Sequence, residues 1–363
     1  MVKPEKIKNI EILRFLFILS IISCHLRDTL KLFFDSIPWY QILHGSFAQS
    51  HRPVDYFFII AGFFLFMTTD FRQNFCDFAK NKLIRMMPLV IFSVFLFWVF
   101  SLFTPIQFPK FEFVFTLLSI NCVGLTFKGS INAAAWFVSA LFWSMCFYFY
   151  LYKITDKKWF NLICACLIFF CYSMYINTTG KMFLNVYSVF NKGILRAFAG
   201  IGVGYFISMI YKDNIESIKN WSLNIWQKLG FTVMEGFLLC WLLYYTFLHH
   251  FRYKNFLILI LAFIGLFWLF LIKKGWISKL LDNNISVFLG QFTFSIFLTH
   301  LLVIILWKRC WCETHQSWVI VNPILNLFIV YTVSILFGVL TFYLFEKPIT
   351  KYLKNKFCAR IKA

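Results

Sequence analysis

Two ionisable residues, Arg14 and His25, lie inside the first apolar stretch of the chain. An ionisable side chain inside a membrane span costs several kcal/mol and usually marks a functional path. Eleven residues of α-helix turn through about 1100°, roughly 20° from whole turns, and rise about 16 Å. The two side chains are therefore predicted to share one face of one helix, with a cation toward one membrane surface and a base toward the other. An enzyme that acts across a bilayer could use such a pair.

Two further candidates lie at a similar predicted depth to His25. Asp55 stands near the outer start of the second apolar stretch, and His300 stands in the outer half of the ninth. Histidine is the usual general base for removing a hydroxyl proton, and a carboxylate can orient its ring. We predict His25, Asp55 and His300 as catalytic residues. The alternative is that these side chains only form hydrogen bonds between helices.

The composition predicts the elements that hold these residues. The chain has 363 residues, of which 61% are apolar, 22% aromatic and 14% charged. A soluble domain of this length does not need so much apolar surface, so we predict an all-α, polytopic membrane bundle. We expect the first span to be retained, because it contains Arg14 and lacks a small-x-small cleavage site. The ten predicted spans are about 10–30, 53–69, 84–103, 134–153, 160–176, 194–211, 229–248, 255–272, 285–307 and 323–345.

The distribution of basic residues predicts the orientation of the spans. With the N-terminus inside, and with the span-end residues Arg27, Arg85 and Lys153 counted with the adjoining segments, 22 of the 35 Lys and Arg residues are cytoplasmic and 11 are external. This bias predicts that both termini are cytoplasmic. The net charge of +20 is then an orientation and anionic-lipid signal, and we expect no nucleic-acid partner. The tail from Glu346 to Ala363 is predicted to be a polar, helix-like end. No linker or repeat is present in the sequence, so residues 1–363 are predicted to form a single domain.

The cysteines and histidines do not predict a metal centre. Six of the 11 cysteines fall in spans, where they behave as small apolar residues. Cys122, Cys310 and Cys312 lie in predicted external loops, so a disulfide from Cys122 to either of the others is one alternative. The pairs His44/His51 and His249/His250 lack further ligands at suitable spacing, and we predict no bound metal.

Several patches along the chain resemble the acyltransferase 3 family of integral-membrane O-acyltransferases. They are Arg14-x10-His25, the segment Val54 to Phe63, the segment Lys82 to Pro88, Trp136-Phe137, Arg196 to Ala199, Phe294 to His300, and Glu346-Lys347-Pro348. Their order and spacing cover nearly the whole chain. One departure is Ala61, which stands where the family usually has serine, so a hydroxyl there is not essential in this chain.

The resemblance implies a donor and an acceptor. The expected activity is transfer of an acetyl group from acetyl-CoA to a hydroxyl of an extracytoplasmic or lipid-linked glycan, in a bacterial inner membrane. Acetyl-CoA is expected as a cosubstrate, and no permanently bound cofactor is expected. His25 would act as a base for direct transfer, or it would carry the acyl group as an acyl-imidazole. Succinyl transfer to a glycan or lipid and export of a polysaccharide precursor are the alternatives.

Three basic residues are predicted to bind the donor. Lys82 and Arg85 lie at the cytoplasmic mouth of the third span, and Arg14 lies in the cytoplasmic half of the first. Guanidinium groups suit phosphates and desolvated carbonyl oxygens. The alternatives are positive-inside anchoring for Lys82 and Arg85, and an i,i+3 ion pair with Glu11 for Arg14.

Four more residues receive interpretations from their place in the spans. Trp136 and Arg196 are predicted to face the glycan, although Arg196 could instead only extend its charge to the membrane surface. Glu235 would be costly inside a span if charged, so it is protonated or paired, with Arg14 as one candidate partner. Glu346 could pair with Arg85 at the same depth. The sequence does not indicate the oligomeric state.

Overall fold

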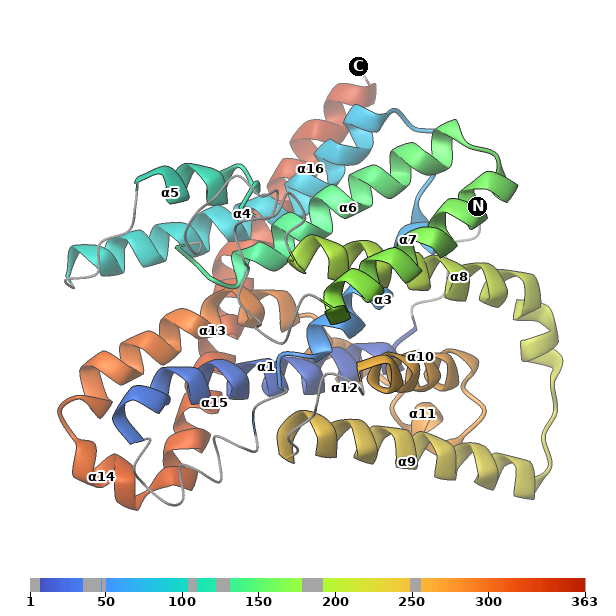
Figure 1. Cartoon of the computed structure of the whole chain (residues 1–363). Coiled ribbons are helices and arrows are strands. Elements are labelled where there is room, and N and C mark those ends of the chain that lie inside the picture. Colours follow the sequence, from blue (N-terminus) through green and yellow to red (C-terminus); the bar gives the residue numbers. More distant parts are fainter. Residues whose placement is uncertain are drawn as a thin grey trace. The chain divides into compact units, whose positions relative to one another are not determined.

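The computed structural model is built from helices (Figure 1), and it describes residues 7–34, 47, 50–103, 110–121, 131–177, 192–248 and 256–362. Within these ranges no residue is in a β-strand. The helices are α1 Asn9–Phe34, α3 Pro53–Thr68, α4 Phe75–Leu102, α5 Lys110–Leu117, α6 Ala135–Ile154, α7 Lys157–Asn177, α8 Lys192–Asn220, α9 Ile225–Leu248, α10 Phe256–Ile272, α11 Trp276–Leu280, α12 Asn284–Gly290, α13 Thr293–Trp307, η2 Lys308–Cys312, α14 Gln316–Val321, α15 Pro323–Thr341, η3 Phe342–Glu346 and α16 Lys347–Lys362.

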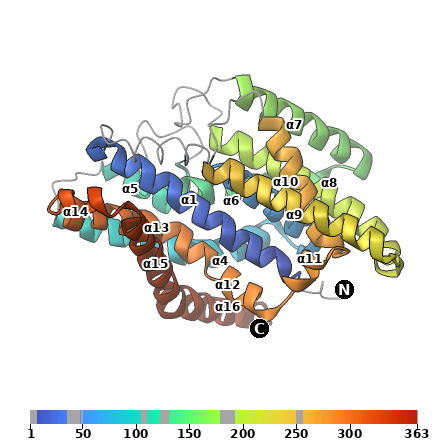
Figure 2. The same cartoon turned by 90° about the horizontal axis from the view of Figure 1, so that it is seen from below.

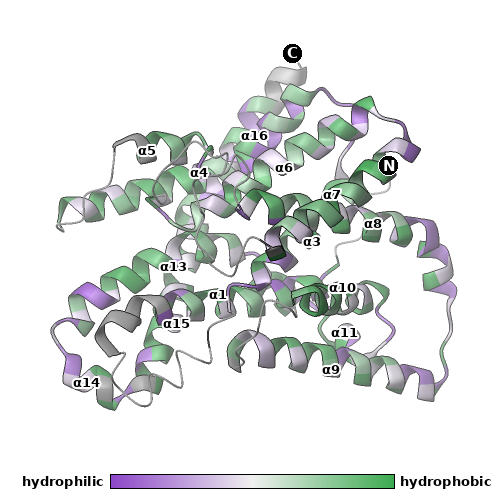
Figure 3. Ribbon diagram, viewed as in Figure 1, coloured by the Kyte–Doolittle hydropathy of each residue, from purple (hydrophilic) through white to green (hydrophobic). Residues whose placement is uncertain are grey.

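Nine of the ten predicted spans each coincide with one helical segment, while the ninth, 285–307, is divided at residues 291–292 into α12 and α13. Among the described residues, eight helices are long and apolar enough to cross a membrane. The other two predicted spans correspond to α3 and α10, which are apolar but have only 16 and 17 residues. Hydrophilic residues gather near helix ends and connections (Figure 3). The predicted all-α polytopic fold is confirmed, while the cytoplasmic location of the termini stays a prediction.

The chain divides into two compact units, each assembled from separate segments. Unit 1 contains Met1–Thr69, Ile176–Gly180 and Gly200–Thr293, and unit 2 contains Asp70–Tyr175, Lys181–Ala199 and Phe294–Ala363. Helix α8 therefore contributes its first eight residues to unit 2 and the remainder to unit 1. The prediction of one domain over residues 1–363 stays a prediction.

In unit 1, helix α1 packs against α3, α10 and α12 (Figure 1). The ring of Phe17 lies 4.8 Å from that of Tyr56 on α3 and 5.4 Å from that of Phe263 on α10. Helices α3 and α8 approach at their backbones, because a Cβ atom at Gly62 would overlap the backbone of Ile201. Aromatic packing and a glycine contact thus fix the helices that hold Arg14, His25 and Asp55.

In unit 2, α4 packs against α5, α6, η3 and α16. The rings of Phe78 and Phe149 stack at 4.1 Å between α4 and α6, and those of Phe92 and Phe345 stack at 3.8 Å between α4 and η3. The ammonium group of Lys80 lies 4.3 Å from the centre of the Phe357 ring, which joins the start of α4 to α16.

The last span does not end at Pro348 but continues through a wider turn into α16. Helices α15, η3 and α16 form one uninterrupted helical path, in which η3 is a π-helical turn. Figure 2 shows the ribbon changing direction between α15 and α16. Proline lacks an N–H group and its ring would meet the carbonyl of Leu344, so a local widening keeps the helix continuous. The polar helical tail expected from the sequence is confirmed as α16.

Candidate functional site

Helix α1 is continuous through both Arg14 and His25. The two residues are eleven positions apart, so their side chains leave the helix in nearly the same direction and about 16 Å apart along its axis. Both side chains are half-buried. The sequence prediction that one helix face displays a cation and an imidazole is consistent with this geometry.

Arg14 forms an ion pair with Glu11, one turn earlier on the same helix. The Nη1 atom of Arg14 lies 2.9 Å from Oε2 of Glu11, and their side chains are 25% and 13% exposed. The structure therefore contains the i,i+3 pair that the sequence offered as one alternative. Arg14 can still bind the acyl donor while it is paired, because its guanidinium group has five N–H donors and Glu11 accepts from only some of them.

Gly290 holds α12 close to this pair. A Cβ atom at Gly290 would lie 2.5 Å from the Cβ atom of Glu11 and 2.8 Å from its carbonyl oxygen, which is closer than atoms can pack. We expect Gly290→Ala to push α12 away from α1 and to lower the free energy of unfolding by about 1–3 kcal/mol.

The measurement for Gly290→Ala is thermal unfolding in detergent, followed by acyl transfer. Gly230→Ala is the matched control, because a Cβ atom there would have no neighbour within 4 Å. Equal stability of the two variants would contradict the proposed close approach of α12 and α1.

Glu235 does not pair with Arg14, which corrects the sequence-based suggestion. Glu235 is fully buried, and its Oε2 atom accepts a hydrogen bond of 3.0 Å from the backbone N–H of Ser278. Ser278 belongs to α11, whose N-cap residue Gly275 has no side chain to cap the helix. The Glu235 carboxylate supplies that acceptor from α9, so its contacts indicate an architectural role.

Asp55 lies fully buried in the first turn of α3. Negative charge at this end of a helix is favoured by the exposed N–H groups and the helix dipole. The neighbouring Tyr56 is also fully buried, and within the described residues its hydroxyl has no hydrogen-bond partner. Sequence reasoning did not select Tyr56, because an aromatic residue in an apolar span gives no distinct signal.

His300 is fully buried on α13, and its hydrogen bond indicates its tautomer. Its Nδ1 atom lies 2.7 Å from the carbonyl oxygen of Phe297. A carbonyl oxygen only accepts hydrogen bonds, so we assign the proton to Nδ1 and the lone pair to Nε2 in the neutral ring. This tautomer can take up a proton at Nε2. His25 and Asp55 lie in unit 1 and His300 lies in unit 2.

Asn132 is a buried residue that the sequence did not reveal and that fixes the helix of His300. Its amide nitrogen donates to Oγ of Ser93 at 3.1 Å and to the carbonyl oxygen of Leu298 at 2.8 Å, and its Oδ1 atom accepts from the N–H of Ala134 at 3.0 Å. One side chain thereby joins α4, α13 and the residues that precede α6.

Arg196 and Trp136, both predicted to face the glycan, lie together in unit 2. The guanidinium carbon of Arg196 is 5.6 Å from the Trp136 ring centre and 5.6 Å from that of Tyr175. Arg196 is only 5% exposed, so the alternative in which it merely extends its charge to the membrane surface is corrected. Two aromatic faces hold the cation instead.

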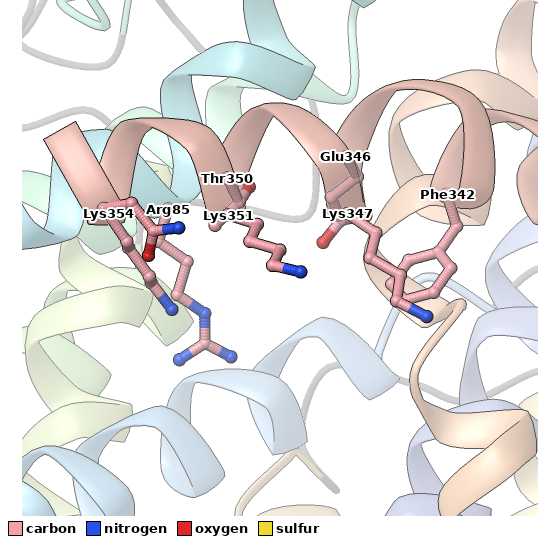
Figure 4. A pocket seen from close by; sticks show the side chains of 8 residues that line it. Arg85, Phe342, Glu346, Lys347, Thr350, Lys351 and Lys354 are labelled. Atoms are coloured by element: carbon pink, nitrogen blue, oxygen red, sulfur yellow. The ribbon is translucent and has the colours of Figure 1, made fainter.

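A basic cavity of about 430 Å³ lies between α4 and the helical path η3–α16. Its lining residues are Arg85, Phe342, Glu346, Lys347, Thr350, Lys351, Lys354 and Asn355. Figure 4 shows the lysine side chains and the Arg85 guanidinium directed toward one space. Glu346 accepts a hydrogen bond from Oγ of Ser295 on α13. The sequence predicted Arg85 and Glu346 at the same membrane depth, and both residues line this cavity.

Lys82 does not line this cavity, although it is one turn from Arg85 on α4. Its ammonium group lies 5.1 Å from the centre of the Phe78 ring. The lysines of α16 were missed because the C-terminal tail was interpreted only as a polar helical end. Their spacing of four and three residues was the available signal, since it puts Lys347, Lys351 and Lys354 on one helix face.

The described residues contain no group of three or more His, Cys, Asp or Glu side chains that could hold a metal ion. The absence of a bound metal stays a prediction, and His44, His249 and His250 lie outside the described residues. Cys310 and Cys312 carry free thiols. Cys122 also lies outside the described residues, so its pairing stays a prediction.

Comparison with known proteins identifies the family. The model of the acyltransferase domain of the acyltransferase 3 family matches residues 7–343. The chain belongs to this family. The residues that match the acyltransferase 3 family belong to both compact units and extend from the start of α1 to η3. No curated protein and no solved structure matches the chain. The chain is thus a multi-pass membrane acyltransferase.

Proposed function

We propose that this protein transfers an acetyl group from cytoplasmic acetyl-CoA to a hydroxyl of an extracytoplasmic or lipid-linked glycan. The match to the acyltransferase domain over residues 7–343 is the observation that carries this proposal. The placement of Arg14 and His25 on the single helix α1 supports it. The proposed setting is the inner membrane of a bacterium, with the lipid bilayer as a further partner.

In the proposed reaction His25 is the general base. The imidazole takes the proton of the acceptor hydroxyl while the hydroxyl oxygen attacks the thioester carbonyl carbon. A carbon–oxygen bond forms, the carbon–sulfur bond breaks, and CoA leaves as a thiolate that takes up the proton. The buried carboxylate of Asp55 would stabilise the imidazolium. His300, whose assigned tautomer has a lone pair on Nε2, is the second proposed base.

The donor is proposed to be held by basic residues of α4 and of α1. Arg85 and Lys82 would hold the nucleotide end, and Arg14 would contact the pantetheine arm or an oxygen of the thioester. The axial distance of about 16 Å between Arg14 and His25 is comparable to the length of that arm. Guanidinium groups bind such oxygens more strongly when water is excluded.

The acceptor is proposed to contact Trp136 and Arg196. The Arg196 cation, held by the rings of Trp136 and Tyr175, has N–H groups suited to sugar hydroxyls. An aromatic ring beside it offers a flat apolar face on which a sugar ring can stack. Both residues belong to unit 2, so they are available to one ligand.

The function is tested by mass spectrometry of surface glycans from two otherwise identical strains, one lacking this protein. We expect acetyl esters that mild alkali removes, present only in the strain that makes the protein. If the strain that lacks the protein makes a glycan of normal length without the esters, the result supports the enzyme. Loss of glycan export itself would contradict the enzyme and favour a carrier. Succinyl esters in place of acetyl esters would indicate succinyl-CoA as the donor in place of acetyl-CoA.

A further inference from the structure

The cavity between α4 and η3–α16 concentrates positive charge. Four of its eight lining residues are cations, namely Arg85, Lys347, Lys351 and Lys354, against one carboxylate. Figure 4 shows these cations reaching the same space from two different helices. A volume of about 430 Å³ lies within the range of sites that bind small molecules. The four cations therefore line one concave site.

The three lysines converge because of their spacing on α16. Residues 347, 351 and 354 are separated by four and three positions, which keeps them within a sector of about 60° on an α-helix. Like charges at such spacing destabilise a helix by about 0.2–0.5 kcal/mol per pair. Within the described residues Lys351 and Lys354 have no ion-pair or hydrogen-bond partner. The arrangement therefore favours an anion with several charges.

The polar and apolar lining indicates the class of anion. The Oγ1 atom of Thr350 is buried without a hydrogen-bond partner in the described residues, so it has a donor to offer. The ring of Phe342 forms an apolar wall, and Glu346 stands beside it, held by Ser295. Eight residues, about 12 Å along the helix, separate Glu346 from Lys354. One end of the cavity thus suits an aromatic base with an amino group, and the other suits phosphates.

We propose that this cavity, with Lys351 and Lys354 as its main contacts, binds the phosphorylated nucleotide end of the acyl donor. The ligand class is an adenosine phosphate that bears a diphosphate and a further phosphate on its ribose. The proposal rests on the proposed function and adds α16 to the donor site. Lys351, Lys354 and Arg85 bind phosphate oxygens, and Phe342 packs against the base. Helix α16 is thereby a binding element and not only a membrane-surface anchor.

The test uses the double variant Lys351→Gln/Lys354→Gln of the full-length protein. Both lysines are exposed, so their replacement leaves the packing of α16 intact. Binding of acetyl-CoA and of adenosine 3′,5′-diphosphate is measured by calorimetry in nanodiscs of phosphatidylcholine. We expect both ligands to bind at least about tenfold more weakly, from the loss of two charge-assisted hydrogen bonds. The matched control, Lys158→Gln/Lys356→Gln, removes the same charge from exposed positions outside the cavity and should bind like the wild type.

The outcomes separate this proposal from the proposed function. If the wild type binds acetyl-CoA and the double variant binds it equally well, the cavity proposal is overturned while the acyltransferase stands. If the wild type binds neither ligand, both are overturned. A variant that keeps its nucleotide affinity but loses stabilisation by added phosphatidylglycerol would overturn the nucleotide site in favour of a lipid headgroup. Weaker binding by the cavity variant alone supports the proposal.

Discussion

Replacing His25 by alanine is expected to reduce acetyl transfer about 10²–10⁴-fold, the usual contribution of a general base. The side chain lies on α1 among buried residues such as Cys24 and Leu26, but it is itself only half-buried, so alanine should be tolerated. Binding of acetyl-CoA should remain near the wild-type level, because the proposed donor contacts lie elsewhere. The measurements are ester formation on the glycan and calorimetric binding of acetyl-CoA.

The control for His25 is His315→Ala. His315 is exposed and stacks on Trp311 at 4.1 Å, so it is a histidine with structural contacts and no proposed role in the reaction. Undiminished ester formation by His25→Ala would remove His25 as the base. Incubation of the wild type with radiolabelled acetyl-CoA and no acceptor separates the two routes. A label trapped on His25 favours the acyl-imidazole, and its absence after rapid quenching favours direct transfer.

Replacing Arg14 by glutamine is expected to raise the KM for acetyl-CoA by about tenfold to a hundredfold. This range corresponds to the loss of one hydrogen bond from a charged group, worth about 1.5–3 kcal/mol. The variant also leaves Glu11 without its ion-pair partner, and Glu11 is only 13% exposed. A fall in stability is therefore expected along with the change in KM, and the two effects must be separated.

The double variant Glu11→Gln/Arg14→Gln separates them. It removes both charges of the 2.9 Å ion pair and leaves two neutral amides that can still form a hydrogen bond. If Arg14 contacts the donor, the double variant recovers stability and keeps the raised KM. If Arg14 only neutralises Glu11, the double variant recovers both stability and KM, and the donor role is refuted. Glu11→Gln alone should retain a near-normal KM in the first case.

The sequence predicted the helices well, because long apolar runs in a membrane protein have few other structures available. It also placed Arg14 and His25 correctly on one helix, since the two residues are close in sequence and helical geometry alone relates them. The prediction of a helical tail after Pro348 was confirmed as well, because it also depends only on residues that are close in sequence. The sequence did not predict the π-helical turn η3, because its formation depends on how the helix accommodates Pro348.

Contacts between distant segments were less predictable. Arg14 was suggested as the partner of Glu235 because their charges are opposite. In the structure Glu235 instead accepts a hydrogen bond from the backbone of α11, whose N-cap residue has no side chain to cap the helix. The contact of Gly290 with Glu11 on α1 and the hydrogen bond of Asn132 to Leu298 connect residues more than a hundred positions apart. A single sequence has no periodicity that reports such pairs.

The cavity was predicted only in part for a similar reason. Arg85 was recognised from the family pattern within α4. In the sequence, Lys351 and Lys354 resemble ordinary positive-inside charges, and only the packing of α16 against α4 shows that they line a cavity with Arg85. Arg196 was also underestimated, because a membrane-end arginine usually extends to the surface. Here the rings of Trp136 and Tyr175 hold it in a buried position.

The most direct test supplies the purified protein, in nanodiscs, with acetyl-CoA labelled in its acetyl group and a lipid-linked glycan fraction from cells that lack the protein. The central claim is that the acetyl group leaves CoA and becomes a glycan ester through the base on α1. We predict alkali-labile label on the glycan with equimolar release of CoA for the wild type, and neither for His25→Ala. Release of CoA without labelled glycan, or equal labelling by both proteins, would contradict the claim.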